Sequence, residues 1–550
     1  MCCKKIYLLL VFFLSAIAAH AQVNSFDIST PVDIDPVGLN KVLCMKSGNT
    51  LLFHFEVGKP VMVRVFDTAH KRLAANEPYT SLLDLSTLRT FIFKGLYDIG
   101  GEAVMFIEQQ NSGRHSLVRL RFNGDSGRLI EEKTMGKSKS LARPTKFFVM
   151  KNKQDESYAI LYSKEVPQFR SCDLRVLYYN ARHESYKEVP LVFNRKQFDY
   201  LDVTSAEALP TGICISLGLS KLEVNGTGMR LENAPVYGHH LGIFFIHKDS
   251  IRPAARFVDV TADVFPYYAN ATYNPFANSI NLLLLSYREL VFQYGIELRP
   301  TALMGNLFFK VDGDNMATDY TWLTNKMANA SLKQQTDTSH FFKGLPLKLL
   351  TSASGLSTVV SESFSRYRNV ETKARADVFE SYFGDICVTQ FDDNGRELWG
   401  AILPKSQYYK SYRHYYTAYE LSKRWQQQEM MTDLPPQVYN RQFVSCNTYS
   451  LGSDIYIVYN DYSKNLHNSN EEPGDTVFTF DHTNTCYYKI DKKKVVTKHY
   501  MFGAPMAKEY KTSFIEGADF DEERGVYASL IQYKRGVYVS LRMAWSRVGD

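Results

Sequence analysis

The alternation of apolar and polar positions between Asp385 and Trp399 predicts a β-hairpin. An apolar, β-rich run ends at Phe391, the turn formers Asp392–Gly395 follow, and a second apolar run reaches Trp399. Glycine accepts a positive φ, and Asp and Asn favour turns, so this cluster is typical of a hairpin connection. Buried-type side chains occupy both faces of the first strand: Ile386, Cys387, Val388 and Phe391. The pattern therefore predicts a strand that is covered on both sides.

The same hairpin pattern recurs along the chain. In four copies an aromatic residue ends the first strand and an apolar or aromatic residue follows seven positions later: Phe66 and Leu73, Phe122 and Leu129, Tyr179 and Tyr186, Phe391 and Leu398. Looser copies lie at Ile243–Ile246, Leu307–Val311, Tyr487–Ile490 and Val537–Met543. Two further apolar strands precede each hairpin, which gives the repeated order strand A, strand B, strand C, strand D. Four antiparallel strands per repeat, with successive sheets covering each other, describe β-propeller blades.

We therefore expect an all-β fold, a single β-propeller with eight four-stranded blades; seven blades are the alternative, because units five and six have weak boundaries. The last unit lacks a fourth strand before the chain stops at Asp550, whereas the β-like run Val23–Ser29 belongs to no unit. Pairing of this N-terminal strand with the Val537–Trp545 region would close the ring and remove its free edges.

One turn also carries a family likeness. Gly395-Arg396-Glu397-Leu398-Trp399 resembles the Gly-Lys-x-x-Trp signature of quinoprotein-type propeller repeats, in which the Trp packs between blades. Over nearly the whole mature chain the resemblance is to β-propeller repeat proteins in general, of an uncharacterised exported bacterial type, through architecture more than motif. It supports the fold and says almost nothing about a quinone cofactor, because a single unit carries the signature. The WD, kelch and sialidase Asp-box patterns are absent.

The N-terminus predicts export. Basic Lys4 and Lys5, a short apolar run and Ala19-His20-Ala21 form a secretory signal, so residues 1–21 are read as a signal peptide and 22–550 as the propeller domain. Cys2 and Cys3 precede the apolar run, so neither occupies the position after it that a bacterial lipoprotein signal needs. No later segment reaches the roughly 18 apolar residues of a membrane span. We expect a periplasmic or extracellular protein without a membrane anchor.

Charge and cysteine content narrow the choice of partners. The formal charge of +6 falls to +4 without Lys4 and Lys5, which is too mild to name a partner, and export argues against nucleic acid. The six cysteines after the signal show neither a C-x-x-C pair nor metal-ligand spacing, so buried thiols are expected, with disulfides as the alternative. His239-His240 lacks a third ligand, and we predict no metal and no cofactor.

Long insertions are expected on one face of the propeller. They follow B or D strands, and antiparallel order returns the chain to the same side after every second strand. The six insertions are Lys221–His240, Arg288–Gly305, Thr324–Gly344, Tyr367–Gly384, Pro404–Gln442 and Tyr462–Thr485.

The segment Lys405–Gln442 is the most unusual insertion. It combines a cluster of six tyrosines, between Tyr408 and Tyr419, with basic residues, and Tyr and Arg are enriched at recognition surfaces. Its predicted ligand-binding residues are Tyr412, Arg413, Tyr416 and Trp425. The alternative is a short helix over the rim with its aromatic side chains packed down.

Polar groups also gather where three B strands should reach the same face. They are Lys164 and Glu165, then Tyr287, Arg288 and Glu289, then Asn460, Asp461 and Tyr462. A ring of such groups around the central opening would bind a ligand; ordinary capping of strand ends is the alternative.

These observations favour an exported, non-enzymatic, monomeric propeller that binds a protein or a glycan through its elaborated face. The alternative is a glycan-active hydrolase or lyase with a site at the propeller axis. No motif identifies catalytic residues, and fold alone does not choose between the two.

Overall fold

The computed structural model describes residues 25–549 except 36–37, 86–90, 112–113, 140–146, 153, 164–173, 192–199, 223–235, 260–264, 288–289, 294–296, 301–302, 313–315, 317, 334–341, 343, 353, 372–375, 412–441 and 468–473. The signal sequence predicted at residues 1–21 therefore lies outside the described residues.

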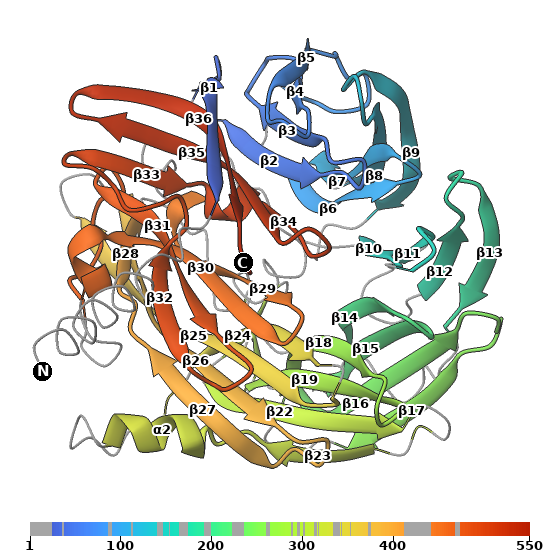
Figure 1. Cartoon of the computed structure of the whole chain (residues 1–550). Coiled ribbons are helices and arrows are strands. Elements are labelled where there is room, and N and C mark those ends of the chain that lie inside the picture. Colours follow the sequence, from blue (N-terminus) through green and yellow to red (C-terminus); the bar gives the residue numbers. More distant parts are fainter. Residues whose placement is uncertain are drawn as a thin grey trace, which may run out of the picture.

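Eight four-stranded antiparallel sheets surround a central axis, as predicted (Figure 1). Blades 1 to 4 consist of β2 (Leu39–Cys44), β3 (Thr50–Phe55), β4 (Met62–Phe66) and β5 (Arg72–Asn76); β6 (Phe91–Ile99), β7 (Glu102–Asn111), β8 (Arg114–Asn123) and β9 (Leu129–Lys139); β10 (Phe147–Lys151), β11 (Tyr158–Ser163), β12 (Leu174–Tyr179) and β13 (Ser185–Pro190); and β14 (Tyr200–Leu209), β15 (Gly212–Leu222), β16 (Val236–His247) and β17 (Ala254–Asp259).

Blades 5 to 8 follow the same order, from the axis outwards. They consist of β18 (Phe265–Asn274), β19 (Ser279–Tyr287), β22 (Leu303–Asp312) and β23 (Thr318–Trp322); β24 (Leu345–Thr351), β25 (Ser357–Glu371), β26 (Ala376–Phe391) and β27 (Glu397–Leu403); β29 (Cys446–Leu451), β30 (Asp454–Tyr462), β31 (Thr483–Ile490) and β32 (Val496–Tyr500); and β33 (Glu509–Ser513), β35 (Val526–Arg535), β36 (Tyr538–Arg547) and β1 (Phe26–Pro31).

The N-terminal strand β1 closes the ring. It pairs antiparallel with β36, with Phe26 opposite Ser546 and Ile28 opposite Ala544 (Figure 1). Trp545 of β36 joins this last blade to the first, because its indole Nε1 donates to Thr50 Oγ1 at 3.0 Å. The prediction of an eight-bladed ring closed by an N-terminal strand is confirmed, with the strand beginning at Phe26.

The hairpin of blade 6 shows how the turn residues act. The Asp392 carboxylate accepts hydrogen bonds from the backbone N–H groups of Asn394 and Arg396, at 3.0 and 2.9 Å. Gly395 has φ 74°, a left-handed conformation that costs glycine little. Ile386, Cys387, Val388 and Phe391 are at most 1% exposed, so the strand is covered on both faces as expected.

The hydrophobic core lies between neighbouring blades. One cluster combines Leu43, Phe53 and Val63 of blade 1 with Phe93 and Phe122 of blade 2. Similar clusters join the later blades, so each blade is stabilised mainly by its two neighbours.

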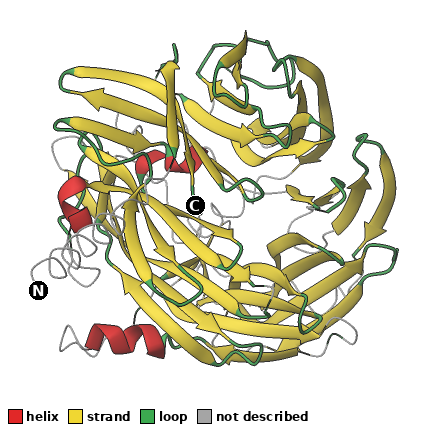
Figure 2. Cartoon of the chain, viewed as in Figure 1, coloured by secondary structure: helices red, strands yellow, loops and turns green. Residues whose placement is uncertain are grey.

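Extra elements interrupt this regular plan in the second half of the chain. They are the hairpin β20 (Leu290–Gln293) and β21 (Glu297–Pro300), helix α2 (Lys326–Lys333), strand β28 (Gln407–Ser411), the 3₁₀ turns η2 (Ser463–His467) and η3 (Ile515–Gly517), and strand β34 (Asp519–Asp521) (Figure 2). The insertion at 367–384 is largely a continuation of β25 and β26, not a loop. Helix α2 packs against β27 and was not anticipated from the sequence.

None of the described helices is long and apolar enough to cross a membrane. The described cysteines are all free: Cys44, Cys214, Cys387, Cys446 and Cys486. Four of them are buried and Cys44 is half-buried. Burial raises the pKa of the Cys214 and Cys387 thiols to about 12, which leaves them protonated and unreactive at neutral pH.

Candidate functional site

Most of the site residues predicted from the sequence lie outside the described part of the chain. This holds for Tyr412, Arg413, Tyr416, Trp425, Lys164, Glu165, Arg288 and Glu289. Tyr287 ends β19, and its side chain is not described either.

Asn460 is fully buried between blades 7 and 8. Its Nδ2 donates to the carbonyl oxygens of Phe443 and Ser513, at 3.0 and 2.8 Å. Its Oδ1 accepts hydrogen bonds from Thr485 Oγ1 and from the backbone N–H of Ser513, at 3.0 and 3.1 Å. The Asn460 side-chain amide therefore links the two blades through hydrogen bonds.

Asp461 follows Asn460 and is also buried. Its carboxylate lies 3.1 Å from the ammonium of Lys498 and accepts a hydrogen bond from Asn465 Nδ2 at 2.7 Å. Burial raises the pKa of Asp461, and the Lys498 charge partly offsets that rise. The pair fixes the start of the blade 7 insertion, because Lys498 also donates to the carbonyl oxygen of Asn465.

Aromatic side chains from three insertions, one of which is the blade 7 insertion, lie in contact with one another. The rings of Tyr382 and Tyr408 lie 5.1 Å apart, and those of Tyr408 and Phe478 lie 5.3 Å apart. Phe478 is 57% exposed, and both tyrosines are half-buried. We call these three side chains the aromatic ledge. Tyr462 supports it, because its hydroxyl oxygen accepts a hydrogen bond from the backbone N–H of Phe478 at 3.3 Å.

The backbone beneath the ledge is tied down. Strand β28 pairs with the extension of β26, which sets Tyr408 opposite Tyr382. Val477, next to Phe478, exchanges two backbone hydrogen bonds of 2.9 Å with the chain around β28 and is fully buried. The ledge thus stands on regular, hydrogen-bonded backbone, which restricts the orientation of its rings.

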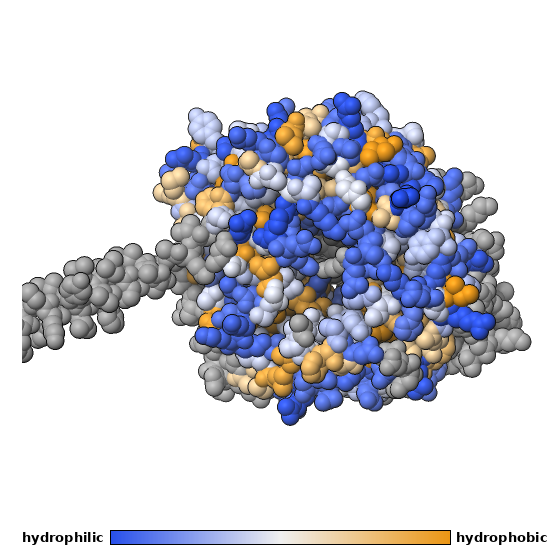
Figure 3. Space-filling model, turned by 45° about the vertical axis from the view of Figure 1, so that its right-hand side comes forward, coloured by the Kyte–Doolittle hydropathy of each residue, from blue (hydrophilic) through white to orange (hydrophobic). Residues whose placement is uncertain are grey.

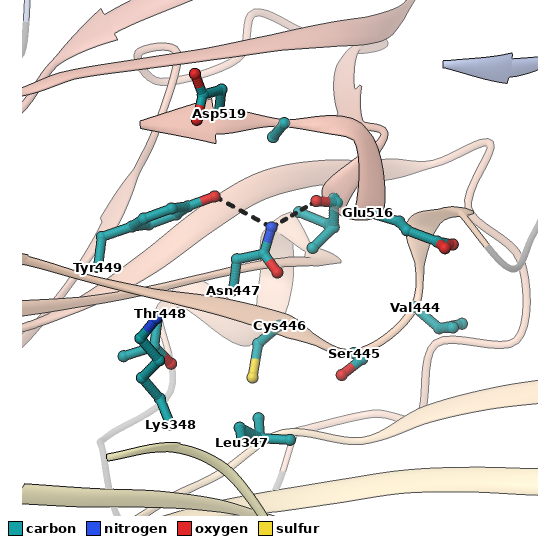
Figure 4. Close-up of a pocket in the computed structure, with 12 residues that line it drawn as sticks. Leu347, Lys348, Val444, Ser445, Cys446, Asn447, Thr448, Tyr449, Glu516 and Asp519 are labelled. Carbon is teal, nitrogen blue, oxygen red and sulfur yellow. Dashed lines mark hydrogen bonds between the residues drawn. The ribbon is translucent and has the colours of Figure 1, made fainter. Parts of the chain in front are cut away.

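A second feature is a cavity of about 260 Å³ at the propeller axis. Its lining comes from the inner strands of blades 6, 7 and 8: Leu347, Lys348, Val444, Ser445, Cys446, Asn447, Thr448, Tyr449, Ile515, Glu516, Ala518 and Asp519 (Figure 4). Figure 3 shows a hollow near the centre of the molecule, surrounded mainly by hydrophilic residues.

The cavity owes its shape to a break in the inner strand of blade 8. The strand β33 ends at Ser513, η3 follows, and β34 resumes at Asp519. Asn447 Nδ2 donates to the carbonyl oxygen of Ile515 at 2.6 Å, and Lys41 Nζ donates to that of Glu516 at 2.8 Å. These two carbonyl groups of the turn are therefore bound, which holds the turn in place.

Glycine is required inside this turn. A Cβ on Gly517 would lie 2.4 Å from the carbonyl oxygen of Asn40, which is backbone and cannot rotate away. The close approach of the two backbones fixes the position of Glu516 and Asp519 relative to blade 1.

The cysteine and the serine of the described lining are not arranged as activated nucleophiles. That lining contains no histidine, and burial raises the pKa of the Cys446 thiol well above its usual value. Ser445 Oγ donates to the Glu362 carboxylate at 2.7 Å, and that carboxylate forms a buried ion pair with Lys405, also at 2.7 Å. The serine is thus a donor to an ion pair, whereas an activated nucleophile would donate to a free base.

Sequence reasoning missed the cavity residues. A signal was present at Lys348, a charged residue inside the apolar run Leu345–Leu350 that forms an inner strand. A charge at such a position must reach either a partner or a solvent-filled space. No comparable signal marked Glu516 and Asp519, which depend on the unexpected turn.

Comparison with known proteins supports no family assignment. No family model matches the chain, and no curated protein matches it. Among solved structures, it is similar to a prolyl endopeptidase (10% identity, TM-score 0.38, 95% of this chain and 57% of that one) and to polysaccharide lyase Uly1 (10%, 0.37, 82% and 89%). It is also similar to the β-propeller domain of the Trilobed protease from Pyrococcus furiosus (7%, 0.33, 84% and 96%). This chain thus spans little more than half of the endopeptidase, and likenesses this distant carry no inference about activity.

Proposed function

We propose that the protein is exported and binds a glycan, without catalysis, through the face that bears its insertions. The aromatic ledge is the observation that supports this proposal. Aromatic rings present flat apolar surface, and tyrosine adds a hydroxyl that hydrogen bonds. Sugar rings have apolar C–H faces edged by hydroxyl groups, so neighbouring rings about 5 Å apart match their chemistry.

The exposure of Phe478 is the part of the ledge that folding does not explain. A phenylalanine that is 57% exposed keeps apolar surface in water, although its backbone is anchored by the buried Val477. Contiguous apolar patches at a surface commonly mark an interaction site, and Phe478 lies in ring contact with Tyr408. The Lys405–Gln442 segment begins at the ledge, and the proposal extends to its Tyr412, Arg413 and Tyr416.

Affinity electrophoresis and pull-down with a panel of soluble and insoluble polysaccharides test the proposal. Phe478→Ser is expected to weaken binding about tenfold, since an aromatic contact contributes about 0.5–1.5 kcal/mol beyond its burial. Phe276→Ser is the matched control, because Phe276 is 73% exposed on the A-to-B turn of blade 5, away from the ledge. Equal binding by the two variants would contradict the proposal.

The adjacent segment provides a second test. Replacing Tyr412, Arg413 and Tyr416 together with Ala is expected to abolish binding and leave the melting temperature nearly unchanged. A large fall in melting temperature would show instead that these side chains are packed. Release of reducing ends or unsaturated sugars by the wild-type protein would replace the binding proposal with the hydrolase or lyase alternative.

Export is tested separately. Mass spectrometry of the protein recovered from its native host is expected to find Gln22 at the mature N-terminus. An N-terminus at Met1 in the cell interior would contradict this part of the proposal.

A further inference from the structure

The hairpin formed by β35 and β36 ends in an exposed apolar turn. Val537 and Tyr538 are 88% and 81% exposed, and Val539 is exposed as well. They form the longest run of exposed large apolar residues in the described part of the chain. Strand β1 does not cover this end, because its pairing with β36 runs only from Ser546 to Arg542. Figure 1 shows the turn at the end of a hairpin that extends beyond β1.

Folding does not explain apolar residues at this turn. Arg535 pairs with Tyr538, so Gly536 and Val537 are the two central residues, and Gly536 has φ 62°. A two-residue turn with Gly first fits the type II′ hairpin, and turns favour Gly, Asn, Asp and Ser. The hairpin turns at 67–70, 392–395 and 491–494 are mainly polar. Val537 thus meets no requirement of the turn.

A neighbouring loop enlarges the apolar surface. The backbone N–H of Gly536 donates to the carbonyl oxygen of Lys508 at 3.0 Å, which sets the loop Met506–Glu509 beside the turn. The Glu509 carboxylate accepts a hydrogen bond from the backbone N–H of Met506 at 2.9 Å, so this loop is held in place. Met506 is exposed. We define the apolar tip as Met506, Val537, Tyr538 and Val539.

Basic side chains lie around the apolar tip. Four of them belong to the loop and the hairpin that form it: Lys508, Lys534, Arg535 and Arg542. The Glu509 carboxylate is buried and already paired with Lys511, whose Nζ lies 3.4 Å from Oε2. Asp33, beyond β1, and Asp481, on the blade 7 insertion, are the exposed carboxylates on the flanking segments. Cations therefore outnumber carboxylates at this end of blade 8.

Shape and charge together select the partner. Consecutive strand residues point to opposite faces, so Tyr538 and Val539 expose apolar surface on both sides of the hairpin. A flat protein surface would cover one side only, whereas the apolar layer of a membrane would cover both. The surrounding cations would then lie level with anionic lipid headgroups. A second copy of the chain would instead bring the same cations together, which is unfavourable.

Blade 1 presents a smaller apolar surface on the same face. Val57, between β3 and β4, and Tyr79, after β5, are exposed. The backbone N–H of Val61 donates to the carbonyl oxygen of Pro78 at 3.2 Å, which joins the two segments. In antiparallel blades, B-to-C turns and D-to-A connections share one face, so these residues and the apolar tip face the same way. A membrane offers a broad surface that adjacent blades can contact together.

We propose that this end of blades 8 and 1 docks on a membrane that contains anionic lipid, with Val537, Tyr538 and Val539 inserted and Lys508 and Arg535 at the headgroups. Tyrosine suits this boundary, because its ring is apolar and its hydroxyl group hydrogen bonds with water. The docking is peripheral and reversible, because a few inserted side chains bury far less apolar surface than a spanning helix. It goes beyond the glycan proposal and does not depend on it.

Flotation of the mature protein with phosphatidylcholine vesicles, with and without phosphatidylglycerol, tests the proposal. Stronger binding to the vesicles with phosphatidylglycerol is expected, with release as salt rises from about 0.05 M to about 0.5 M, because salt screens the attraction. Equal binding to both kinds of vesicle would overturn the proposal. Binding to neither would also overturn it and would favour a protein partner that encloses the tip.

Two double variants separate insertion from charge attraction. Val537→Ser with Tyr538→Ser is expected to weaken binding to the anionic vesicles about tenfold or more, because both side chains lose apolar burial. Lys508→Gln with Arg535→Gln is expected to weaken it by a similar factor, since each basic residue near an anionic surface contributes about fivefold. Wild-type binding by either double variant would overturn the assigned contacts.

The matched controls lie on the opposite face, in A-to-B and C-to-D turns. They are Phe276→Ser with Val495→Ser, and Lys492→Gln with Lys493→Gln, all four side chains being exposed. Both controls are expected to bind like the wild type. A loss in the controls as large as in the tip variants would overturn the choice of face.

Fluorescence quenching measures insertion directly. Val537→Trp places an indole at the apolar tip, and lipids with brominated chains are expected to quench the added emission, whereas Val495→Trp should be quenched little. An unquenched indole at position 537 in vesicle-bound protein would overturn the insertion. Val537→Ser with Tyr538→Ser is expected to keep polysaccharide binding, which is measured without lipid, so failure here is distinguishable from failure of the glycan proposal.

Discussion

Removal of the closing strand is expected to cost several kcal/mol. Deletion of residues 22–34 removes β1, whose only described strand partner is β36. Arg547 and Met543 of β36 lose hydrogen bonds to Ser25 and Ser29, at 2.9 and 3.0 Å, and the bond of 2.8 Å from Val32 to Leu541 is also lost. At about 1 kcal/mol each, these three bonds contribute about 3 kcal/mol.

Side-chain burial adds to this estimate. Val32 is 7% exposed and joins the cluster that contains Trp545, so its loss costs about 2 kcal/mol. Half-buried Ile28 adds about 1 kcal/mol. The bonds and the burial together contribute about 6 kcal/mol. With an unfolding entropy of about 2.1 cal/mol/K per residue, a chain of this length should melt roughly 5 °C lower.

Differential scanning calorimetry of the mature protein and the deletion variant measures this change. Light scattering should also reveal concentration-dependent association, because the exposed edge of β36 presents unpaired backbone groups. Thr30→Ala, an exposed change within β1, is the control and should melt like the wild type. A deletion variant that melts within about 1 °C of the wild type, against the roughly 5 °C expected, would refute the closure argument.

Three further predictions concern buried polar groups. Burial raises the pKa of Glu207 from a usual value of 4.5 to about 7, so the stability contributed by the protonated carboxyl group is present at low pH and is lost as pH rises through 7. Glu207→Gln should therefore be more stable than wild type by about 3 kcal/mol at pH 8 and within about 1 kcal/mol of it at pH 5. Thermal melts across this pH range measure the difference. Asn460→Ala should lower the free energy of unfolding by about 3 kcal/mol in urea titrations, because it leaves buried hydrogen-bonding partners in two blades unpaired. A loss below about 1 kcal/mol would contradict the role of Asn460 in linking the blades. Lys405→Leu should lower the free energy of unfolding by about 3–5 kcal/mol, because it leaves the buried Glu362 carboxylate without its counter-charge. Adding Glu362→Leu should restore part of that loss. If the effects of the two substitutions were simply additive in the double variant, the two side chains would not be energetically coupled.

The blades could be predicted from the sequence because each strand carries its own signal. Alternating apolar residues, a polar turn and an aromatic at the end of strand C recur with enough regularity to count eight units. The run Val23–Ser29, which belongs to no unit, could then supply the fourth strand that the last unit lacks. These signals are local, and the packing of blade on blade follows from them.

The sites could not be predicted in the same way, because they depend on contacts between distant residues. The ledge forms only because β28 returns to pair with the extension of β26, and a polar-aromatic segment gave little indication of that pairing. The cavity depends on η3, which breaks an otherwise ordinary inner strand. A period-two pattern does not show that Lys348 and Asp519 will flank the same space.

Closure and cavity are linked through blade 8. Strand β34, which carries Asp519, pairs with β35; β35 pairs with β36, and β36 pairs with β1. The turn η3 between β33 and β34 is also bound by Lys41 of blade 1 and Asn447 of blade 7. Both neighbouring blades therefore hold the turn, and the closed ring keeps them at a fixed separation. A propeller with an open seam would let blade 1 move away from blade 8, so the orientation of Asp519 depends on the strand that completes the ring.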